Sequence, residues 1–271
     1  MIMKEKLIKC TKEGSALLAV NFYNFETLKG LLLAAKHTNS NLILQLSESS
    51  LQYLGIEPAV AMARSMMKEY AVEGWIHLDH GSSVDVVTKC LHAGFDSVMI
   101  DASEQSFEDN VRITCEAVKI AEAFNANVEA ELGYVAKLGQ DQIAEPTTAA
   151  DAKRFAEATG INALAIAIGN AHGFYKETPD LRLDRLAEIR AVTSCALVLH
   201  GSSGIPDIQL RQAIKCGISK INLATETKNT FMRKLQFLLA DNEEIDLRKV
   251  FPKAIDEVEE LITRKLNVIN Q

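Results

Sequence analysis

Eight short apolar runs, rich in β-branched residues, recur along the chain and constrain its fold more than any other feature. Their starts lie 22 to 36 residues apart. The runs are Ala16–Tyr23, Asn41–Ser47, Gly74–His80, Asp96–Ala102, Asn127–Gly133, Ala163–Gly169, Cys195–Gly201 and Lys220–Thr225. Several of them, such as ALAIAIG and CALVLHG, are almost continuously apolar, which is typical of strands buried on both faces of a parallel sheet.

Helical patterns fill the gaps between these runs. Residues 107–124 place apolar side chains close to the 3.6-residue period of a helix, at Val111, Cys115, Val118 and Ala121. Other helix-like segments are Asp184–Val192, Asp207–Lys215 and Glu226–Leu239. Strands that alternate with helices indicate an α/β protein, and eight such units predict a right-handed (β/α)8 TIM barrel. Such a barrel takes about 250 residues, so we expect residues 1–271 to form a single domain.

An open, doubly wound sheet is the alternative fold, but the even spacing of eight units and the lack of a GxGxxG turn favour the barrel. Two helical segments lie outside the repeat, Glu5–Gly14 and Lys253–Leu266, and we expect these extra N- and C-terminal helices to cap the barrel or pack in an oligomer. The segment Tyr134–Ala149 is polar and irregular. Because it follows the fifth strand, we expect it to form a mobile lid.

Composition excludes several classes of protein. The net charge is −7 without a basic cluster, which argues against nucleic-acid binding. No apolar run is long enough to cross a membrane, and the N-terminal MIMKEKLIKC lacks the apolar core of a signal peptide. The five cysteines are odd in number and never form a CxxC pair, so we expect no disulfide framework and a cytoplasmic protein.

Three histidines occupy equivalent places in the repeat. His80 ends the third strand, His172 follows the sixth, and His200 ends the seventh, and a glycine directly follows each of them. Because the carboxyl ends of barrel strands open onto one face, which carries the active site, these imidazoles should converge. Three protein nitrogens with an open fourth position form the ligand set of a catalytic zinc.

Other titratable residues lie beside this set. Asp79 directly precedes a proposed ligand near the end of a buried strand, where a charge is costly unless it is paired or functional. Glu131 and Asp101 end neighbouring strands, and either one is a candidate metal ligand or a partner of a ligand histidine. His77 shares a face with Asp79, so we expect a structural role inside the barrel. The remaining two histidines, His37 and His92, lie in helical segments, where we expect exposure.

Two small-residue clusters follow the last two strands. They are GSSG at 201–204 and NLAT at 222–225. The loops after strands seven and eight are the usual phosphate site of this fold, and glycines and a helix N-terminus let backbone N–H groups approach an anion. The sequence therefore predicts a phosphate site here, although many such turns are plain helix caps.

Several motifs together resemble the class II fructose-bisphosphate and tagatose-bisphosphate aldolases, over nearly the whole chain. They are VNFYN (20–24), HLDHGSS (77–83), VMIDAS (98–103), VEAELG (128–133), RFAEATGINALAIAIGNAHG (154–173), LVLHGSSG (197–204) and INLATE (221–226). The resemblance implies a zinc-dependent lyase that reversibly cleaves a phosphorylated ketose to dihydroxyacetone phosphate and an aldehyde. It also implies a homodimer or homotetramer and a monovalent cation, Na+ or K+, in the phosphate loops.

The resemblance carries roles over to individual residues. His80, His172 and His200 match zinc ligands, and Glu131 matches a carboxylate that binds or flanks the metal. Asp79 matches the catalytic aspartate, which exchanges a proton with the oxygen at the bond being made or broken. Positions matching those around the ketose 1-phosphate are Gly173, Gly201, Ser203, Asn222, Ala224 and Thr225. Positions matching those that line the pocket are Asn21, Gln45, Ser47 and Ser103.

Two departures from the family pattern bear on the substrate. Family members commonly carry a GGxED-type loop after ELG, whose glutamate exchanges a carbon-bound proton; here Gly139 takes that place, with Asp141 and Glu145 as alternatives. A DPR segment near the C-terminus commonly reaches the terminal phosphate; here it reads Asp-Leu-Arg, and Arg248 is either an anion ligand, across a subunit interface, or a structural residue.

Three hypotheses follow. The first is an active aldolase, and the departures allow an unusual deoxy or sulfonated ketose phosphate as its substrate. The second is a catalytically altered relative that has lost turnover. The third is a zinc-dependent barrel hydrolase, but such enzymes usually show an HxH pair at the end of the first strand, whereas this strand ends in NFYN.

Overall fold

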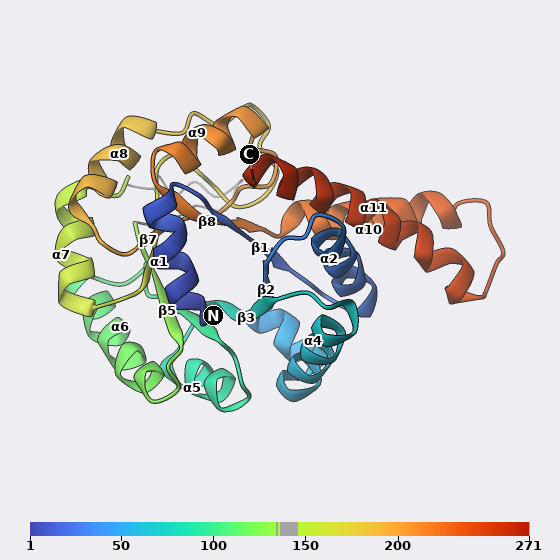
Figure 1. Cartoon of the computed structure of the whole chain (residues 1–271), viewed down its shortest axis with the longest axis horizontal. Coiled ribbons are helices and arrows are strands. Elements are labelled where there is room, and N and C mark those ends of the chain that lie inside the picture. Colours follow the sequence, from blue (N-terminus) through green and yellow to red (C-terminus); the bar gives the residue numbers. More distant parts are fainter. Residues whose placement is uncertain (134, 136–145, 271) are drawn as a thin grey trace.

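The computed structural model describes residues 1–133, 135 and 146–270, and within them eight parallel strands close into a barrel in chain order, β1 to β8 (Figure 1). The strands are β1 (Leu17–Asn21), β2 (Leu42–Ser47), β3 (Gly74–Gly81), β4 (Ser97–Ile100), β5 (Asn127–Leu132), β6 (Ala163–Ile166), β7 (Ala196–Leu199) and β8 (Ile218–Leu223). Each predicted run overlaps one strand, although β3 ends one residue later and β8 begins two residues earlier than predicted, and the predicted (β/α)8 barrel is confirmed.

Helices surround the barrel and follow the strands. They are α1 (Met3–Glu13), α2 (Phe25–His37), α3 (Glu48–Leu54), α4 (Ile56–Tyr70), α5 (Val84–His92), α6 (Phe107–Glu122), α7 (Ala149–Thr159), α8 (Leu183–Val192), α9 (Asp207–Lys215), α10 (Thr225–Leu239) and α11 (Leu247–Ile269). The two predicted extra helices are α1 and α11. The latter begins six residues before the expected Lys253 because Asp246 caps it, and Pro252 lies inside it.

The inside of the barrel has an apolar half and a polar half. At the amino ends of the strands, α1 lies across the barrel mouth (Figure 1) and buries Met3, Leu7 and Cys10 against the inward side chains of the strands. At the carboxyl ends the inward side chains are polar and still buried, among them His77 and Glu129. A packed apolar half therefore supports a polar half, which is the usual place of an active site in this fold.

The inner face of α6 differs from the sequence prediction. The period was right and Ala121 is buried as predicted, but the other buried positions are Asn110, Thr114 and Ala117, each one residue before a predicted one. Asn110 Nδ2 donates to the backbone oxygen of Glu131, 2.9 Å away, so a polar residue takes the place beside β5. The helix thereby fixes the end of the strand that carries Glu131.

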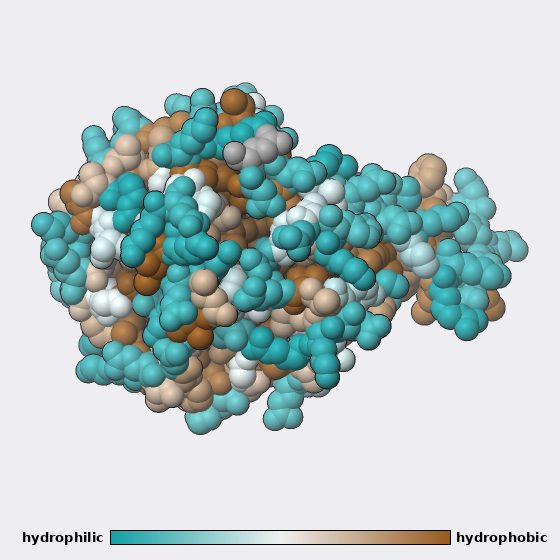
Figure 2. Space-filling view, viewed as in Figure 1, coloured by the Kyte–Doolittle hydropathy of each residue, from teal (hydrophilic) through white to brown (hydrophobic). Residues whose placement is uncertain are grey.

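The outer ends of α10 and α11, with residues 240–246 between them, project from the barrel as an arm (Figure 1). Apolar side chains lie among polar ones on this arm (Figure 2), and Phe237 and Ile245 are 77% and 91% exposed. In the part of the chain that the structure describes, no helix combines the length and apolarity needed to span a membrane.

Candidate active site and metal centre

The end of β3 turns two consecutive side chains toward the same place. Neighbouring residues of a regular strand point to opposite faces, but the β3–β4 register shifts between Leu78 and Gly81. His80 within this bulge has a φ of 52°, a conformation that a residue with a side chain rarely adopts. Because of this bend, Asp79 and His80 both face the carboxyl end of the barrel, and Nε2 of His80 lies 3.9 Å from Oδ1 of Asp79.

Four side chains from four different strands or their loops converge here. One ligand atom of each of His80, Glu131, His172 and His200 lies within 4.8 Å of the others. The ring centroids of His80 are 5.1 Å from His172 and 4.8 Å from His200. The three histidines and the carboxylate named from the sequence are therefore brought together in one cluster that can hold a metal ion.

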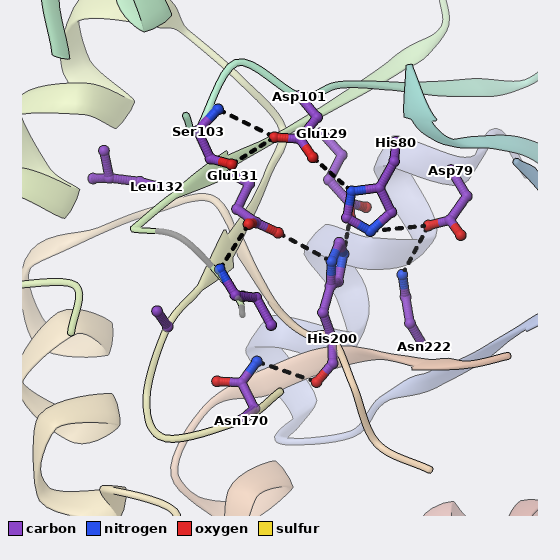
Figure 3. Close-up of polar contacts among 12 residues, drawn as sticks. Asp79, His80, Asp101, Ser103, Glu129, Glu131, Leu132, Asn170, His200 and Asn222 are labelled. Carbon is purple, nitrogen blue, oxygen red and sulfur yellow. Dashed lines mark hydrogen bonds and ion pairs between the residues drawn. The ribbon is translucent and has the colours of Figure 1, made fainter. Parts of the chain in front are cut away.

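The outer nitrogens of the cluster have partners that fix the rings. Nδ1 of His80 lies 2.7 Å from Oδ2 of Asp101, and Ser103 donates from its hydroxyl and its backbone N–H to the other oxygen of Asp101. Nε2 of His200 lies 2.9 Å from Oε1 of Glu129. Figure 3 shows these carboxylates behind the two rings. A carboxylate behind a ligand histidine sets which nitrogen faces the metal.

Two buried polar atoms within the cluster face each other as an ion pair and have no further hydrogen-bond partner among the described residues. They are Oε2 of Glu131 and Nδ1 of His200, 3.2 Å apart. Burial lowers the pKa of His200, but Glu129 and Glu131 outweigh it and raise this pKa to about 10. The two carboxylates thus favour a positive charge at this point. A divalent cation in place of the Nδ1 proton fits both observations.

His172 is suited to bind a metal at neutral pH. Burial, reinforced by the charges of His200 and His80, lowers its pKa to about 3. Its imidazole is therefore neutral near pH 7, as a metal ligand must be.

Asp79 is held by two amides. Asn21 Nδ2 donates to Oδ2 over 2.9 Å, and Asn222 Nδ2 donates to Oδ1 over 3.4 Å. Burial acts to raise the pKa of Asp79, but the charges of His80, His200 and Lys220 outweigh burial and lower this pKa. The carboxylate is thus ionised and oriented beside the cluster.

A small cavity of about 50 Å3 opens beside Asp79 and two of the histidines. Its lining residues are Asn21, Asp79, His80, His172, Gly173, Gly201, Ser203, Asn222, Ala224 and Thr225. Thr225 begins α10, whose N-cap residue Ala224 makes no side-chain capping bond. Ser203 Oγ accepts from the backbone N–H of Glu226, 3.1 Å away. A helix N-terminus and small residues make this wall suitable for an anion.

Gly201 permits the close approach of two loops at this cavity. Its φ is +62°, and an added Cβ would collide with the carbonyl oxygen of Ala171. Tyr175 bridges the same loops, because its hydroxyl accepts from Ala171 N–H at 2.7 Å and donates to the Gly201 carbonyl at 2.9 Å.

Three residues named from the sequence lie elsewhere. Gln45 is fully buried behind Asn21 and donates from Nε2 to its Oδ1 over 3.1 Å. Ser47 caps α3, facing Ser50, although it pairs with Asp79 in the β2–β3 register. The Arg248 side chain is 90% exposed on the arm and pairs with Asp246. The predicted lid residues Lys137, Gly139, Gln140, Asp141 and Glu145 lie outside the described residues.

The other histidines lie where the sequence placed them. His77 is completely buried inside the barrel, with Nδ1 2.7 Å from Ser97 Oγ. His37 and His92 are exposed on α2 and α5, and His37 pairs with Glu259.

Two buried charges were missed by the sequence analysis, Glu129 on β5 and Lys220 on β8, whose charged atoms lie 2.8 Å apart. Each lies two residues before a residue that was named, Glu131 or Asn222. The two-residue period of a strand, applied again, places them on the same inward face.

Known proteins resemble this chain along its full length. Residues 1–271 match the family model described as fructose-bisphosphate aldolase class-II. A probable fructose-bisphosphate aldolase of Bacillus subtilis (strain 168) is 40% identical across 97% of this chain and 95% of its own length. A fructose-bisphosphate aldolase of Geobacillus stearothermophilus is 39% identical across 97% and 94%. The YdjI aldolase of Escherichia coli K12 has a similar structure, with a TM-score of 0.87 and 31% identity over 98% of this chain and 96% of that one.

A parallel barrel with a histidine and carboxylate cluster at the carboxyl ends of its strands defines the class, a (β/α)8-barrel protein with a candidate metal site at the face that carries active sites in this fold. The chain belongs to the class II fructose-bisphosphate aldolase family. It is accordingly a class II aldolase, and its reaction is the cleavage of a ketose phosphate.

Proposed function

We propose that this aldolase reversibly cleaves a phosphorylated ketose to dihydroxyacetone phosphate and an aldehyde, with Asp79 as the proton-transfer residue. The supporting observation is the position of Asp79, a buried carboxylate whose Oδ1 lies 3.9 Å from Nε2 of His80. A substrate oxygen held at the cluster would lie within reach of this carboxylate. Asp79 would then exchange a proton with the hydroxyl or aldehyde oxygen at the bond that breaks or forms.

Zinc is the proposed metal, held by His80, His172 and His200. Nitrogen ligands with an open position suit catalytic zinc, and Glu131 would add or exchange as a fourth ligand. Zinc bound there would act as a Lewis acid on the substrate ketone and offset the negative charge that develops as the C3–C4 bond breaks. The chain's own part is to hold the rings, through Asp101 and Glu129, and to keep Asp79 ionised.

The phosphate of the ketose would bind between the two small-residue clusters. The N-terminus of α10, Gly173, Gly201 and Ser203 line the cavity beside Asp79. A helix N-terminus attracts an anion, and the glycines leave backbone N–H groups accessible. Carbonyl oxygens of the same loops would hold a monovalent cation, Na+ or K+, against the phosphate charge.

The reaction is tested by a coupled assay for dihydroxyacetone phosphate release. The panel contains fructose and tagatose bisphosphates together with deoxy and sulfonated ketose 1-phosphates. Release from at least one of them by zinc-loaded protein is expected. If none reacts while the folded protein still binds zinc and dihydroxyacetone phosphate, the protein is a non-catalytic relative and the proposed activity is wrong.

We also propose that segment 134–149 selects the substrate and that fructose 1,6-bisphosphate is not the preferred one. The motivation is the sequence departure from the family's GGxED loop. Lys137 would supply a point charge for a distal phosphate or sulfonate, and Asp141 is a candidate for the missing acid–base residue. The measurement is kcat/KM across the panel for wild type, Lys137→Ala and Asp141→Ala. If fructose 1,6-bisphosphate is the best substrate and neither variant changes it, this proposal fails.

The protein is further proposed to be a cytoplasmic homodimer or homotetramer that associates through the arm. Exposed Phe237, Ile245 and Leu247 on the arm are costly to leave in water, which favours a second copy as their partner. Arg248 on the same arm would then approach a neighbouring site. Light scattering of wild type and Phe237→Ser/Ile245→Ser tests this: the variant should shift to monomer, and an unchanged mass would contradict it.

A further inference from the structure

Lys220 is a fully buried lysine inside the barrel, on β8, two residues before Asn222. Its ammonium makes three contacts: 2.8 Å to Glu129 Oε2, 2.8 Å to Asn222 Oδ1 and 3.5 Å to His77 Nε2. Lys220 lines no part of the cavity beside Asp79. A buried charge is costly to retain, and beyond helping to keep Asp79 ionised this one has no direct contact with the proposed reaction.

The ammonium group determines which way the Asn222 amide faces. A lysine ammonium has only donors, and an ionised carboxylate has only acceptors. Asn222 lies between one of each, with Oδ1 toward Lys220 and Nδ2 toward Asp79 Oδ1 at 3.4 Å. The reverse orientation would set the amide NH2 against the ammonium and the amide oxygen against the carboxylate, so Lys220 excludes it.

The other oxygen of Asp79 is held in a similar way. Asn21 Nδ2 donates to Asp79 Oδ2 over 2.9 Å, and Gln45 Nε2 donates to Asn21 Oδ1 from behind. Asp79 has only acceptors, so it requires Nδ2 of Asn21 to face it without any help from Lys220. Lys220 acts on the second amide alone: it accepts no hydrogen bond, and it therefore holds Oδ1 of Asn222 on the side away from the carboxylate.

We infer that Lys220 is a positioning residue: through the amide of Asn222 it fixes the pose of Asp79. This inference rests on the proposed role of Asp79 for its kinetic consequence, while the orientation of Asn222 stands independently of the reaction. Glu129 neutralises the ammonium and contacts His200 Nε2 at 2.9 Å. The same buried ion pair thus connects the carboxylate that moves the proton with a proposed metal ligand.

Removing Lys220 alone would leave Glu129 buried without its ion pair, which risks misfolding. The test therefore uses the neutral pair Lys220→Met/Glu129→Gln, in which the glutamine still accepts from His200. Thermal unfolding and elemental analysis verify folding and metal content. Lys265→Met is the matched control, because Lys265 is also buried and ion-paired, with Asp207 and Glu226, but contacts neither Asp79 nor the two asparagines.

The kinetic expectation is a fall in kcat of roughly 10- to 100-fold for Lys220→Met/Glu129→Gln, the size expected for a misplaced catalytic group. KM should change less than about threefold, since neither substituted residue lines the cavity. In an Asn222→Ala background the same pair should change kcat by less than about threefold, because the amide it orients is gone. A merely structural role would instead multiply the two losses. Wild-type kcat in the pair, or multiplicative losses, would overturn the inference.

A second readout does not need turnover. In protein labelled with 15N-asparagine, the Asn222 side-chain amide signals are assigned by their loss in Asn222→Ala. They should shift in Lys220→Met/Glu129→Gln and stay in place in Lys265→Met. Unchanged Asn222 signals would overturn the positioning of the amide. If those signals shift but wild type cleaves no ketose phosphate, the positioning holds and the proposed reaction fails, so the two outcomes are distinct.

Discussion

Oε2 of Glu131 and Nδ1 of His200 form an ion pair over 3.2 Å in the barrel interior, and neither has a further hydrogen-bond partner among the residues described. The other oxygen of Glu131, Oε1, accepts from the Val135 N–H over 3.1 Å, and the other nitrogen of His200, Nε2, contacts Glu129. An acceptor and a nitrogen left facing one another in this way leave room for a bound cation between them and the other two histidines.

The metal content of variants follows from this geometry. Purified protein should hold about one zinc per chain, and His172→Ala and His200→Ala should lose it, because two remaining imidazoles bind zinc weakly. Elemental analysis after dialysis gives the measurement, with exposed His92→Ala as the control that keeps its zinc. Full metal occupancy in both ligand variants would rule out this site.

Gly201→Ala should destabilise the protein more than Gly160→Ala. Both glycines have a left-handed backbone, with φ of +62° and +68°. An alanine in that conformation costs about 1–2 kcal/mol. A Cβ at Gly160 meets nothing within 4 Å, whereas one at Gly201 collides with the Ala171 carbonyl. Urea unfolding of both variants measures the difference, and equal losses would show that the two loops are not packed as described.

Stability at acid pH should depend on His77. Burial, together with the charge of Lys220, lowers its pKa to about 3, from 6.5 for an unperturbed histidine. Between those values the unfolded chain binds a proton that the folded chain does not, so the free energy of unfolding should fall as the pH drops below 6.5. The slope from this one group is at most about 1.4 kcal/mol per pH unit.

His77→Gln should remove that part of the slope, and the exposed His92→Gln should keep it. The measurement is urea unfolding of metal-free protein from about pH 7 to about pH 5, where a single proton gives the slope stated above. Identical slopes for wild type and His77→Gln would mean that His77 is protonated in the folded protein.

Ser203→Ala should weaken binding of the phosphorylated ketose and leave kcat nearly unchanged. A hydrogen bond to a charged group contributes roughly 1–3 kcal/mol, which corresponds to a rise in KM of about 5- to 150-fold. Ser106→Ala is the control, because Ser106 also accepts from a helix-start N–H but lines no part of the cavity. If KM is the same in both variants, the phosphate lies elsewhere.

The sequence was sufficient to predict the barrel and the convergence of the three histidines, because strand period and position at strand ends determine both; it left Glu131 and Asp101 as alternative carboxylates, and the structure places Glu131 in the cluster. It could not show that Asp79 and His80 face the same side, since this depends on a register shift between β3 and β4. The Glu129–Lys220 pair spans β5 and β8, which are not neighbours, and only closure of the barrel brings them together. Arg248 lies on the exposed arm and not at the site of its own chain, because α10 and α11 extend beyond the barrel, and local sequence patterns do not encode this extension.

The most direct test of the account is turnover in Asp79→Ala with its metal in place. Zinc-loaded wild type should release dihydroxyacetone phosphate from a ketose 1-phosphate, and zinc-loaded Asp79→Ala should do so on the order of 10² times more slowly or worse, as expected for a lost proton-transfer group. Zinc content is measured on the same samples and should be equal. Near wild-type kcat in a folded, zinc-loaded Asp79→Ala protein would contradict the account.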